Sequence, residues 1–258
     1  MAYPYGIDSY QLAAGQTITS AELAEIDFHL CRIGTHGYGG MGTSSWYNRG
    51  FSTDAYCLSN IQATQAAGKL MGVYVFSYAW DAASAEREAT EVCDVLDTWG
   101  ISLELPIFLD WESTGTAIGS YEMYQSQIGS TISTATLESI FVAFHARCAA
   151  RGRSAGMYFN GWFVDSLLPS SWIATQRAAG NYFWLASWVT YPTDPPTPCD
   201  IWQYAADKQY IGNLSVNYNV DQNWLINPNI VAGSKIPTWL KIYLANRGDK
   251  NAKRSVLL

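Results

Sequence analysis

The feature that most constrains the fold is an alternation of short apolar runs with longer stretches of helical periodicity. The runs have the length of buried strands, and the stretches between the early ones repeat apolar residues at the spacing of an amphipathic helix. The strand-like runs cover residues 5–11, 28–35, 70–79, 105–112, 154–160, 182–188, 199–205 and 218–224. The helix-like stretches cover residues 20–27, 54–67, 83–98 and 134–151. This alternation predicts parallel strands with the helices packed outside them.

The number of candidate strands favours a closed barrel over an open sheet. The helical signal is clear in the first half of the chain and fades after residue 170, where proline, tryptophan and short strands dominate. We therefore predict an α/β fold, an irregular TIM-like barrel with about five βα units followed by three strands joined by short loops. An open doubly wound sheet is the alternative, although no GxGxxG motif follows the first strand.

Charge is distributed unevenly along the chain. The formal net charge is −7, yet residues 234–258 contain six basic residues and one acid, so the preceding body is strongly acidic. An acidic body argues against nucleic acid as the main partner, because phosphate binding needs clustered lysine and arginine. We predict a barrel over residues 1–233 and a basic C-terminal tail over 234–258. The tail contains the amphipathic segment TWLKIYLAN, which suits a helix or a docking arm.

Cysteine usage and the N-terminus indicate where the protein is made. The five cysteines are scattered and form no CxxC pair, so buried free thiols are expected rather than a disulfide framework or a zinc cluster. The start MAYPYGIDSYQ has no basic region and no apolar core of a secretory signal. No apolar run approaches the roughly 18 residues of a membrane span. We expect synthesis in the cytoplasm without a signal peptide, and no membrane insertion.

Four acidic residues lie at the ends of predicted strands. Asp8 ends the first strand, Asp110 and Glu112 end the fourth, and Asp221 ends the eighth. In parallel barrels the catalytic groups come from the C-terminal strand ends, and the first and eighth strands are neighbours when the barrel closes. Asp110 and Glu112 are two residues apart, so their side chains point the same way. We predict that the four carboxyl groups face one pocket mouth.

Such crowding has a chemical consequence. Neighbouring charges and burial beside aromatic rings both disfavour ionisation, so at least one acid should have a raised pKa and stay protonated near neutral pH. A protonated acid close to an ionised one is what cleavage of a glycosidic bond requires. The 11 Trp and 17 Tyr fit a sugar-binding protein, although an aromatic-rich core explains them equally well. A single acid at a strand end can be a helix cap or half of a surface salt bridge, whereas four together favour chemistry.

Other chemistries have weaker support. The three histidines are spread out with no HExxH or HxH spacing, and the DxDxDG pattern of calcium loops is absent. No GxSxG elbow occurs, and no cysteine has a partner motif. We therefore expect no metal site and no cofactor.

Several segments resemble, in the same order, the motifs of the glycoside hydrolase family 25 lysozymes, the Chalaropsis-type N-acetylmuramidases common in bacteria and phages. They are GIDSYQ, MGVYVFSYA, LDWE, GMYFNGWF, WLASW, IWQYA and VDQN, which together span residues 5–224. Each is weak alone, but together they are specific, and LDWE and VDQN carry most weight. The resemblance implies a (β/α)5(β)3 barrel that hydrolyses the β-1,4 bond between N-acetylmuramic acid and N-acetylglucosamine in peptidoglycan.

The resemblance also implies roles for individual residues. Glu112 would be the general acid/base, and Asp110 would orient or charge-stabilise the acetamido group of the substrate. Asp8 and Asp221 would complete an acidic floor. The sequence leaves open whether an aspartate or the acetamido oxygen attacks the sugar, although the DxE spacing resembles that of substrate-assisted enzymes. The candidate sugar contacts are Tyr78, Trp80, Trp111, Tyr158, Asn160, Trp188 and Gln203. Core packing is an equal alternative for each aromatic ring.

The expected partner is the glycan strand of peptidoglycan, and the expected place of action is the bacterial cell wall, as a phage endolysin or a virion-associated lysozyme. Phage lysins of this family typically add a wall-binding module, whereas here the basic tail 234–258 follows the barrel. Its charge predicts docking on an anionic wall polymer, a virion or another protein; folding back on the barrel is the alternative. A catalytically silent glycan-binding barrel is the competing function, but a binding module gains little from crowded carboxylates.

Overall fold

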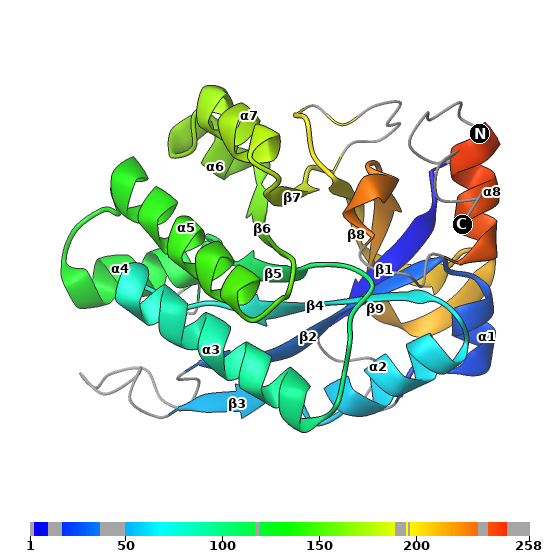
Figure 1. Cartoon of the computed structure of the whole chain (residues 1–258). Coiled ribbons are helices and arrows are strands. Elements are labelled where there is room, and N and C mark those ends of the chain that lie inside the picture. The colour runs from blue at the N-terminus through cyan, green and yellow to red at the C-terminus, as the bar shows by residue number, and fades with distance from the viewer. Residues whose placement is uncertain are drawn as a thin grey trace.

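The described part of the chain forms a closed barrel of eight strands with helices outside it (Figure 1). The computed structural model describes residues 3–9, 17–36, 50–116, 119–188, 195, 197–231 and 237–246. The barrel strands are β1 (Tyr5–Ser9), β2 (Phe28–His36), β4 (Leu70–Phe76), β5 (Ile107–Asp110), β6 (Ala155–Asn160), β7 (Tyr182–Ala186), β8 (Ile201–Ile211) and β9 (Leu214–Leu225). The short strand β3 (Phe51–Thr53) pairs with β2 outside the barrel.

Strand pairing confirms the predicted irregular (β/α)5(β)3 barrel. Strands β1, β2, β4, β5, β6, β7 and β8 pair in parallel in that order, and β9 closes the barrel by pairing antiparallel with both β8 and β1. Strands β8 and β9 are joined by a tight turn after Ile211, so this connection forms a hairpin and needs no crossover helix. In the described part of the chain, no helix lies between β7 and β8 or between β8 and β9.

The predicted helices are present, with shifts at their ends. They are α1 (Ser20–Ala24), α2 (Cys57–Ala66), α3 (Ala82–Thr98) and α5 (Thr134–Ala150). The sequence reading missed α4 (Ser120–Ile128), α6 (Gly161–Ser166), α7 (Ser170–Ala178) and the 3-10 turn η2 (Pro228–Ile230). Helix α3 begins where the Asp81 side chain accepts from Ser84 N and the Ser84 hydroxyl accepts from Asp81 N, which satisfies two backbone donors at its start.

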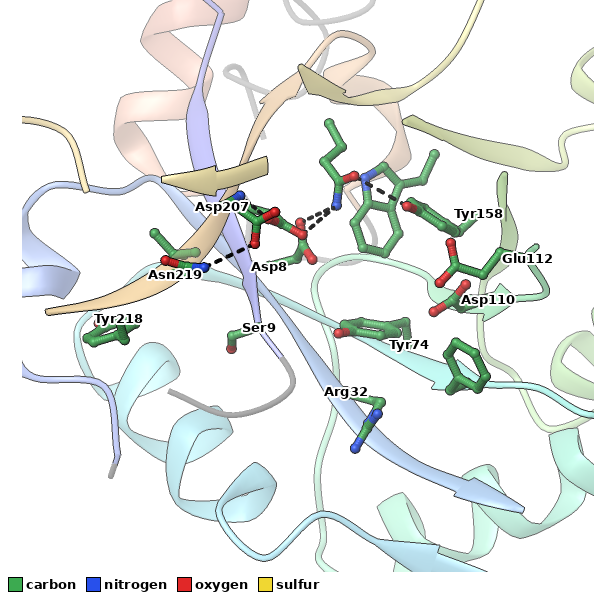
Figure 2. Close-up of a pocket in the computed structure, with 15 residues that line it drawn as sticks. Asp8, Ser9, Arg32, Tyr74, Asp110, Glu112, Tyr158, Asp207, Tyr218 and Asn219 are labelled. Atoms are coloured by element: carbon green, nitrogen blue, oxygen red, sulfur yellow. Dashed lines mark hydrogen bonds between the residues drawn. The ribbon is translucent and has the colours of Figure 1, made fainter. Parts of the chain in front are cut away.

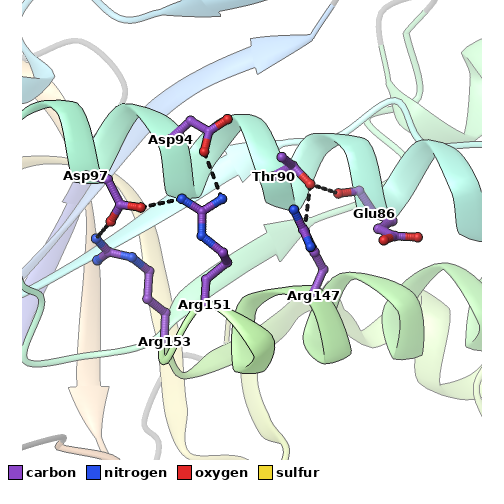
Figure 3. Close-up of polar contacts among 7 residues, drawn as sticks. All are labelled: Glu86, Thr90, Asp94, Asp97, Arg147, Arg151 and Arg153. Carbon is purple, nitrogen blue, oxygen red and sulfur yellow. Dashed lines mark hydrogen bonds and ion pairs between the residues drawn. The ribbon is translucent and has the colours of Figure 1, made fainter.

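Polar contacts link the exposed sides of α3 and α5 (Figure 3). Arg151 pairs with Asp94 at 2.8 Å and also with Asp97, and Arg153 pairs with Asp97 at 2.6 Å. Exposed pairs of this kind contribute little to stability, because water and salt screen them. The packing of the two helices therefore depends mainly on their buried apolar faces, which join one hydrophobic cluster with the outward side of the barrel strands.

Successive residues of each strand face opposite sides of the barrel wall. In β5, Ile107 and Leu109 face the helices and belong to the outer hydrophobic cluster. Phe108 faces inward and packs in the barrel interior, where its ring meets that of Trp184 at 5.6 Å between centroids. The side chains of the next two inward positions, 110 and 112, therefore point into the barrel mouth.

The opposite end of the barrel, where the parallel strands begin, is closed by α8 (Thr238–Asn246) (Figure 1). Leu240 and Leu244 of α8 are buried in one hydrophobic cluster with Phe28 and Leu70, the first residues of β2 and β4. This part of the predicted tail, TWLKIYLAN, thus folds back on the barrel. Residues 247–258 of the tail lie outside the described residues. No described helix has the length and apolar character needed to cross a membrane.

Candidate active site

Strand β5 delivers two carboxyl groups to the barrel mouth. Asp110 is the last residue of the strand and Glu112 follows two residues later, and both side chains point into the same cavity (Figure 2). Trp111, between them, faces the other way because side chains alternate along an extended chain. Its ring is fully buried among helix-facing residues, and its indole N–H donates to the Ala79 carbonyl at 2.8 Å. Trp111 therefore lies in the core, and its prediction as a sugar contact is corrected.

The first and last barrel strands bring the other two acids together. Asp8 and Asp221 are register partners in the antiparallel pair of β1 and β9. Asp221 lies inside β9, not at its C-terminal end as the sequence reading expected. The reason is direction: β9 runs antiparallel to β1, so it enters the closed part of the barrel from the mouth. All four predicted acids line one cavity.

The cavity at the mouth has a volume of about 470 Å³ and mixes acids with aromatic rings. It is lined by Asp8, Ser9, Arg32, Tyr74, Phe76, Asp110, Glu112, Tyr158, Trp184, Gln203, Asp207, Tyr218, Asn219, Val220 and Asp221. Figure 2 shows Asp110, Glu112 and Tyr158 on one side of this cavity and Asp8, Asp207 and Asn219 on the other. A ligand in it therefore has carboxyl groups on two sides.

Gln203 connects the acids at the centre of the site. Its amide nitrogen donates to Asp8 at 2.9 Å and to Asp221 at 3.4 Å. Its carbonyl oxygen accepts from the Tyr158 hydroxyl and from the Trp188 indole, each at 3.2 Å. Because all four contacts use one buried amide, Gln203 fixes the orientation of both acids relative to two predicted sugar contacts.

Burial dominates the ionisation of the acids. It raises the pKa of Asp8 well above the usual value, and the charge of Asp221 raises this pKa further, against hydrogen bonds from Asn223 and Gln203 that lower it. Burial and then the charges of Asp221 and Glu122 raise the pKa of Glu112 to about 7. The expectation of a carboxylic acid that stays protonated near neutral pH thus has a specific candidate.

Little in the surroundings of Asp110 compensates for its burial. Burial and the charge of Glu112 raise its pKa well above the usual value, and only Arg32 lowers it. Its Oδ1 atom is buried and has no hydrogen-bond partner among the described residues. A buried acceptor without a donor destabilises the fold by about 1–3 kcal/mol. A substrate N–H placed there would satisfy it.

Of the remaining predicted sugar contacts, some line the cavity and others do not. Tyr158 and Gln203 line the cavity, and Trp188 lies next to Gln203 with 63% of its surface exposed. The Asn160 amide approaches the Ser113 carbonyl, just after Glu112, at 3.5 Å. Tyr78 is buried and Trp80 partly buried, and neither is among the residues that line the cavity.

Several residues that line the cavity were not predicted. Arg32 of β2 lies among apolar neighbours and pairs with Asp54 at 2.8 Å, and a charge inside an apolar run was a signal that could have found it. Tyr74 and Trp184 face inward by strand alternation. Asp207 has a left-handed backbone, with φ of 54°, at an irregularity of β8, and its N–H donates to Asp221 at 2.9 Å. Pairing irregularities of this kind depend on the partner strand, so the sequence of β8 did not indicate it.

Among the described residues, no group of three or more histidine, cysteine, aspartate or glutamate side chains has an arrangement that could hold a metal ion. The four carboxyl groups line one cavity. Their arrangement can hold one proton-donating acid beside ionised carboxylates, as glycosidic bond cleavage requires.

Comparison with known proteins identifies the family. A profile described as glycosyl hydrolases family 25 matches residues 50–213, more than half of the chain. The chain belongs to glycosyl hydrolases family 25. It is therefore a glycoside hydrolase, as predicted. The matched range contains Asp110 and Glu112, whereas Asp8 and Asp221 lie outside it and are linked to the site by the barrel closure. A search of curated proteins finds no match.

Solved structures share the fold of this family 25 member. The spore cortex lytic enzyme SleM of Clostridium perfringens is 20% identical with a TM-score of 0.63, over 86% of this chain and 67% of that one. The lysozyme of Streptomyces coelicolor is 23% identical with a TM-score of 0.59, over 88% and 93%. The modular autolysin LytC of Streptococcus pneumoniae is 17% identical with a TM-score of 0.61, over 85% of this chain, which spans only 46% of LytC.

Proposed function

We propose that this family 25 hydrolase is a peptidoglycan muramidase that cleaves the β-1,4 bond between N-acetylmuramic acid and N-acetylglucosamine, with Glu112 as general acid/base. One observation carries the proposal: Glu112, with a pKa of about 7, shares a cavity with three further carboxyl groups. A proton donor for the leaving oxygen therefore lies close to negative charge that can stabilise an oxocarbenium-like transition state.

Each of the four predicted carboxyl groups has a role in the proposed reaction. Protonated Glu112 gives its proton to the glycosidic oxygen as the bond to the sugar C1 breaks. We propose that the acetamido oxygen of the same sugar attacks C1, while the unpaired Asp110 Oδ1 accepts from the acetamido N–H and holds it in place. Glu112, now ionised, takes a proton from the water that opens this intermediate. Attack on C1 by an aspartate is the alternative route, and Asp8 and Asp221 supply the surrounding negative charge in both.

We propose a division between catalytic and sugar-contacting groups. Tyr158 and Gln203 line the cavity, and Asn160 lies beside the loop that follows Glu112. Trp188 presents an exposed ring whose edge is fixed by Gln203, as a stacking surface for a sugar requires. Tyr78 and Trp80 do not line the cavity, so sugar contact by either ring stays a prediction.

The structural relatives support the substrate class. SleM is described as a spore cortex lytic enzyme, and LytC is known in complex with a synthetic peptidoglycan ligand. Action at the bacterial cell wall follows for this chain as a proposal, whether it acts as an endolysin or on a virion. Docking of the basic tail 234–258 on a wall polymer or a protein partner stays a prediction. The proposed division into a catalytic barrel (1–233) and a tail (234–258) is modified by α8, which packs under the barrel.

Analysis of digested cell walls tests the proposal. Purified peptidoglycan is incubated with the protein, and the soluble products are reduced and identified by mass spectrometry. Reducing-end muramic acid is the expected product. Reducing-end glucosamine would reassign the bond, and intact glycan that remains bound to the protein would favour the silent glycan-binding barrel.

A further inference from the structure

The first turn of α4 contacts the segment that carries Glu112. The Glu112 N–H donates to the Ser120 hydroxyl at 3.2 Å, and the Glu112 carbonyl accepts from the Tyr121 N–H at 3.1 Å. The Ser120 hydroxyl in turn donates to the Ser77 carbonyl at 2.6 Å, just after β4. Both backbone polar groups of Glu112 are therefore held by one helix end, which is itself anchored to the neighbouring strand.

The next residue of α4 extends this contact along the loop. The Glu122 Oε1 atom accepts from the Ser113 hydroxyl at 2.5 Å and from the Gly115 N–H at 3.0 Å. The Oε2 atom accepts from the Thr114 N–H at 3.4 Å. Three consecutive loop residues thus donate to one carboxylate, directly after the proposed acid. The three helix residues Ser120–Glu122 hold the four loop residues Glu112–Gly115.

Gly119, which precedes α4, is what permits this close approach. A Cβ atom at Gly119 would lie 2.0 Å from Glu122 Oε2 and 2.8 Å from Thr114 N. The backbone of Gly119, with φ of −69°, is open to any residue, so the requirement for glycine comes from space and not from conformation. The Glu122 carboxylate and the loop at Thr114 therefore occupy the space that a side chain at position 119 would need.

We infer that Glu122 is a positioning residue of the proposed reaction: it fixes the loop that carries Glu112 and places a second negative charge behind that acid. The inference rests on the proposed function, because it assigns Glu122 a task in the use of Glu112. Glu122 lies in the first turn of α4, where the helix N-terminus favours a negative charge. The same charge favours the protonated form of Glu112 that a proton donor needs.

Several titratable groups on different strands and helices surround Glu112 and influence its pKa. Those in electrostatic contact with Glu112 are Asp110 on its own strand, Asp8 on β1, Tyr158 on β6, Asp221 on β9 and Glu122 on α4. Arg32 on β2 acts on Asp110. Of these, only Glu122 is absent from the residues that line the cavity, so its charge can be changed without altering the surface that a substrate meets.

The test compares Glu122→Gln with Glu122→Ala. Glutamine keeps an acceptor for Ser113 and Gly115 but removes the charge, so turnover at pH 5 should stay within about twofold of wild type. The alkaline limb of kcat, set by Glu112 near pH 7, should move down by about 0.5 unit because one nearby charge is lost. Alanine also releases the loop, so kcat should fall about tenfold at every pH while KM changes little.

Glu138→Gln is the matched control, since Glu138 is also a partly buried glutamate but lies on α5, a different helix. The pKa of Glu112, followed by carboxyl carbon NMR without substrate, gives a second readout that does not depend on which bond is cleaved. An unchanged Glu112 titration in Glu122→Gln, or wild-type kcat in Glu122→Ala, would overturn the inference. If the wild type releases no muramic acid, the proposed function fails instead, and the NMR shift still decides the role of Glu122.

Discussion

The two ends of the barrel interior differ in polarity, although the same strands line both of them. At the end where the parallel strands begin, Leu240 and Leu244 of α8 seal an apolar core. At the other end, the inward positions carry Asp8 and Asp110, both almost fully buried and both with raised pKa values. The first end gains stability from burial, whereas the second loses stability by holding acids where water is scarce.

This difference shows that the mouth of the barrel holds groups that destabilise the fold. Asp110 Oδ1, a buried acceptor without a donor among the described residues, lies at the mouth, while α8 covers the floor with apolar side chains. Substitutions at the floor should therefore lower stability and leave chemistry intact, whereas substitutions at the mouth should lower activity without lowering stability. The following predictions test that separation, beginning with the largest effect.

Glu112→Gln should lower the rate of wall lysis by about a thousandfold, because glutamine keeps the shape of the side chain and cannot donate a proton to the leaving oxygen. Turbidity loss of purified walls gives the rate, and a sedimentation assay with the same walls should show binding close to wild type. The thermal unfolding temperature should not fall. Lysis at the wild-type rate would remove Glu112 from the role of acid.

Leu240→Ala should lower the free energy of unfolding by about 3 kcal/mol, since it removes a fully buried side chain from the floor of the barrel. The activity per folded molecule should be unchanged below the new unfolding transition. Urea titration measures the stability change. Ile242→Ala on the same helix is the control, because Ile242 is exposed and its removal should change stability by less than about 0.5 kcal/mol. Equal effects of the two substitutions would mean that α8 does not seal the barrel.

Much of the barrel could be predicted because its strands are apolar runs and its main helices repeat every three to four residues. The elements that were missed lack these signals. The outer half of the β8–β9 hairpin is largely exposed and polar, and α4 and α6 are short, so local pattern says little about them. Their conformation depends on the barrel against which they lie.

The site was predictable to a similar degree. Four acids at strand ends could be placed in one mouth because a closed barrel makes its first and last strands neighbours. Trp111 was misplaced although the same alternation rule that groups Asp110 with Glu112 directs it outward. Glu122 could not be found, because it comes from a helix that the sequence did not indicate. Asp207 depends on an irregularity in strand pairing.

Asp110→Asn should raise the stability at pH 7 by about 1–2 kcal/mol while it lowers activity. The pKa of Asp110 is raised in the folded state, so between about pH 4 and that raised value the native state binds more protons than the unfolded state. Wild-type stability then falls as pH rises through this window, and the asparagine variant does not share that fall. The stability difference should therefore be small at pH 4 and larger at pH 7.

Chemical denaturation at several pH values measures that difference. Asp94→Asn, which removes an exposed ion pair with Arg151, is the control and should change stability by less than about 0.5 kcal/mol at each pH. A stability gain that does not depend on pH would show that Asp110 ionisation is not what destabilises the mouth.

Trp188→Ala should have the smallest effect, a rise in KM of about fivefold with kcat nearly unchanged, because the loss of one stacking surface weakens ground-state and transition-state binding alike by about 1 kcal/mol. Trp188→Phe keeps a flat ring and should recover most of the affinity. Tyr56→Ala removes an exposed ring at the start of α2, which does not line the cavity, and should change nothing. Steady-state kinetics on soluble glycan fragments separates KM from kcat. A fall in kcat with KM unchanged would show that Trp188 acts through its hydrogen bond to Gln203, and so on the orientation of Asp8 and Asp221, rather than as a surface for the sugar.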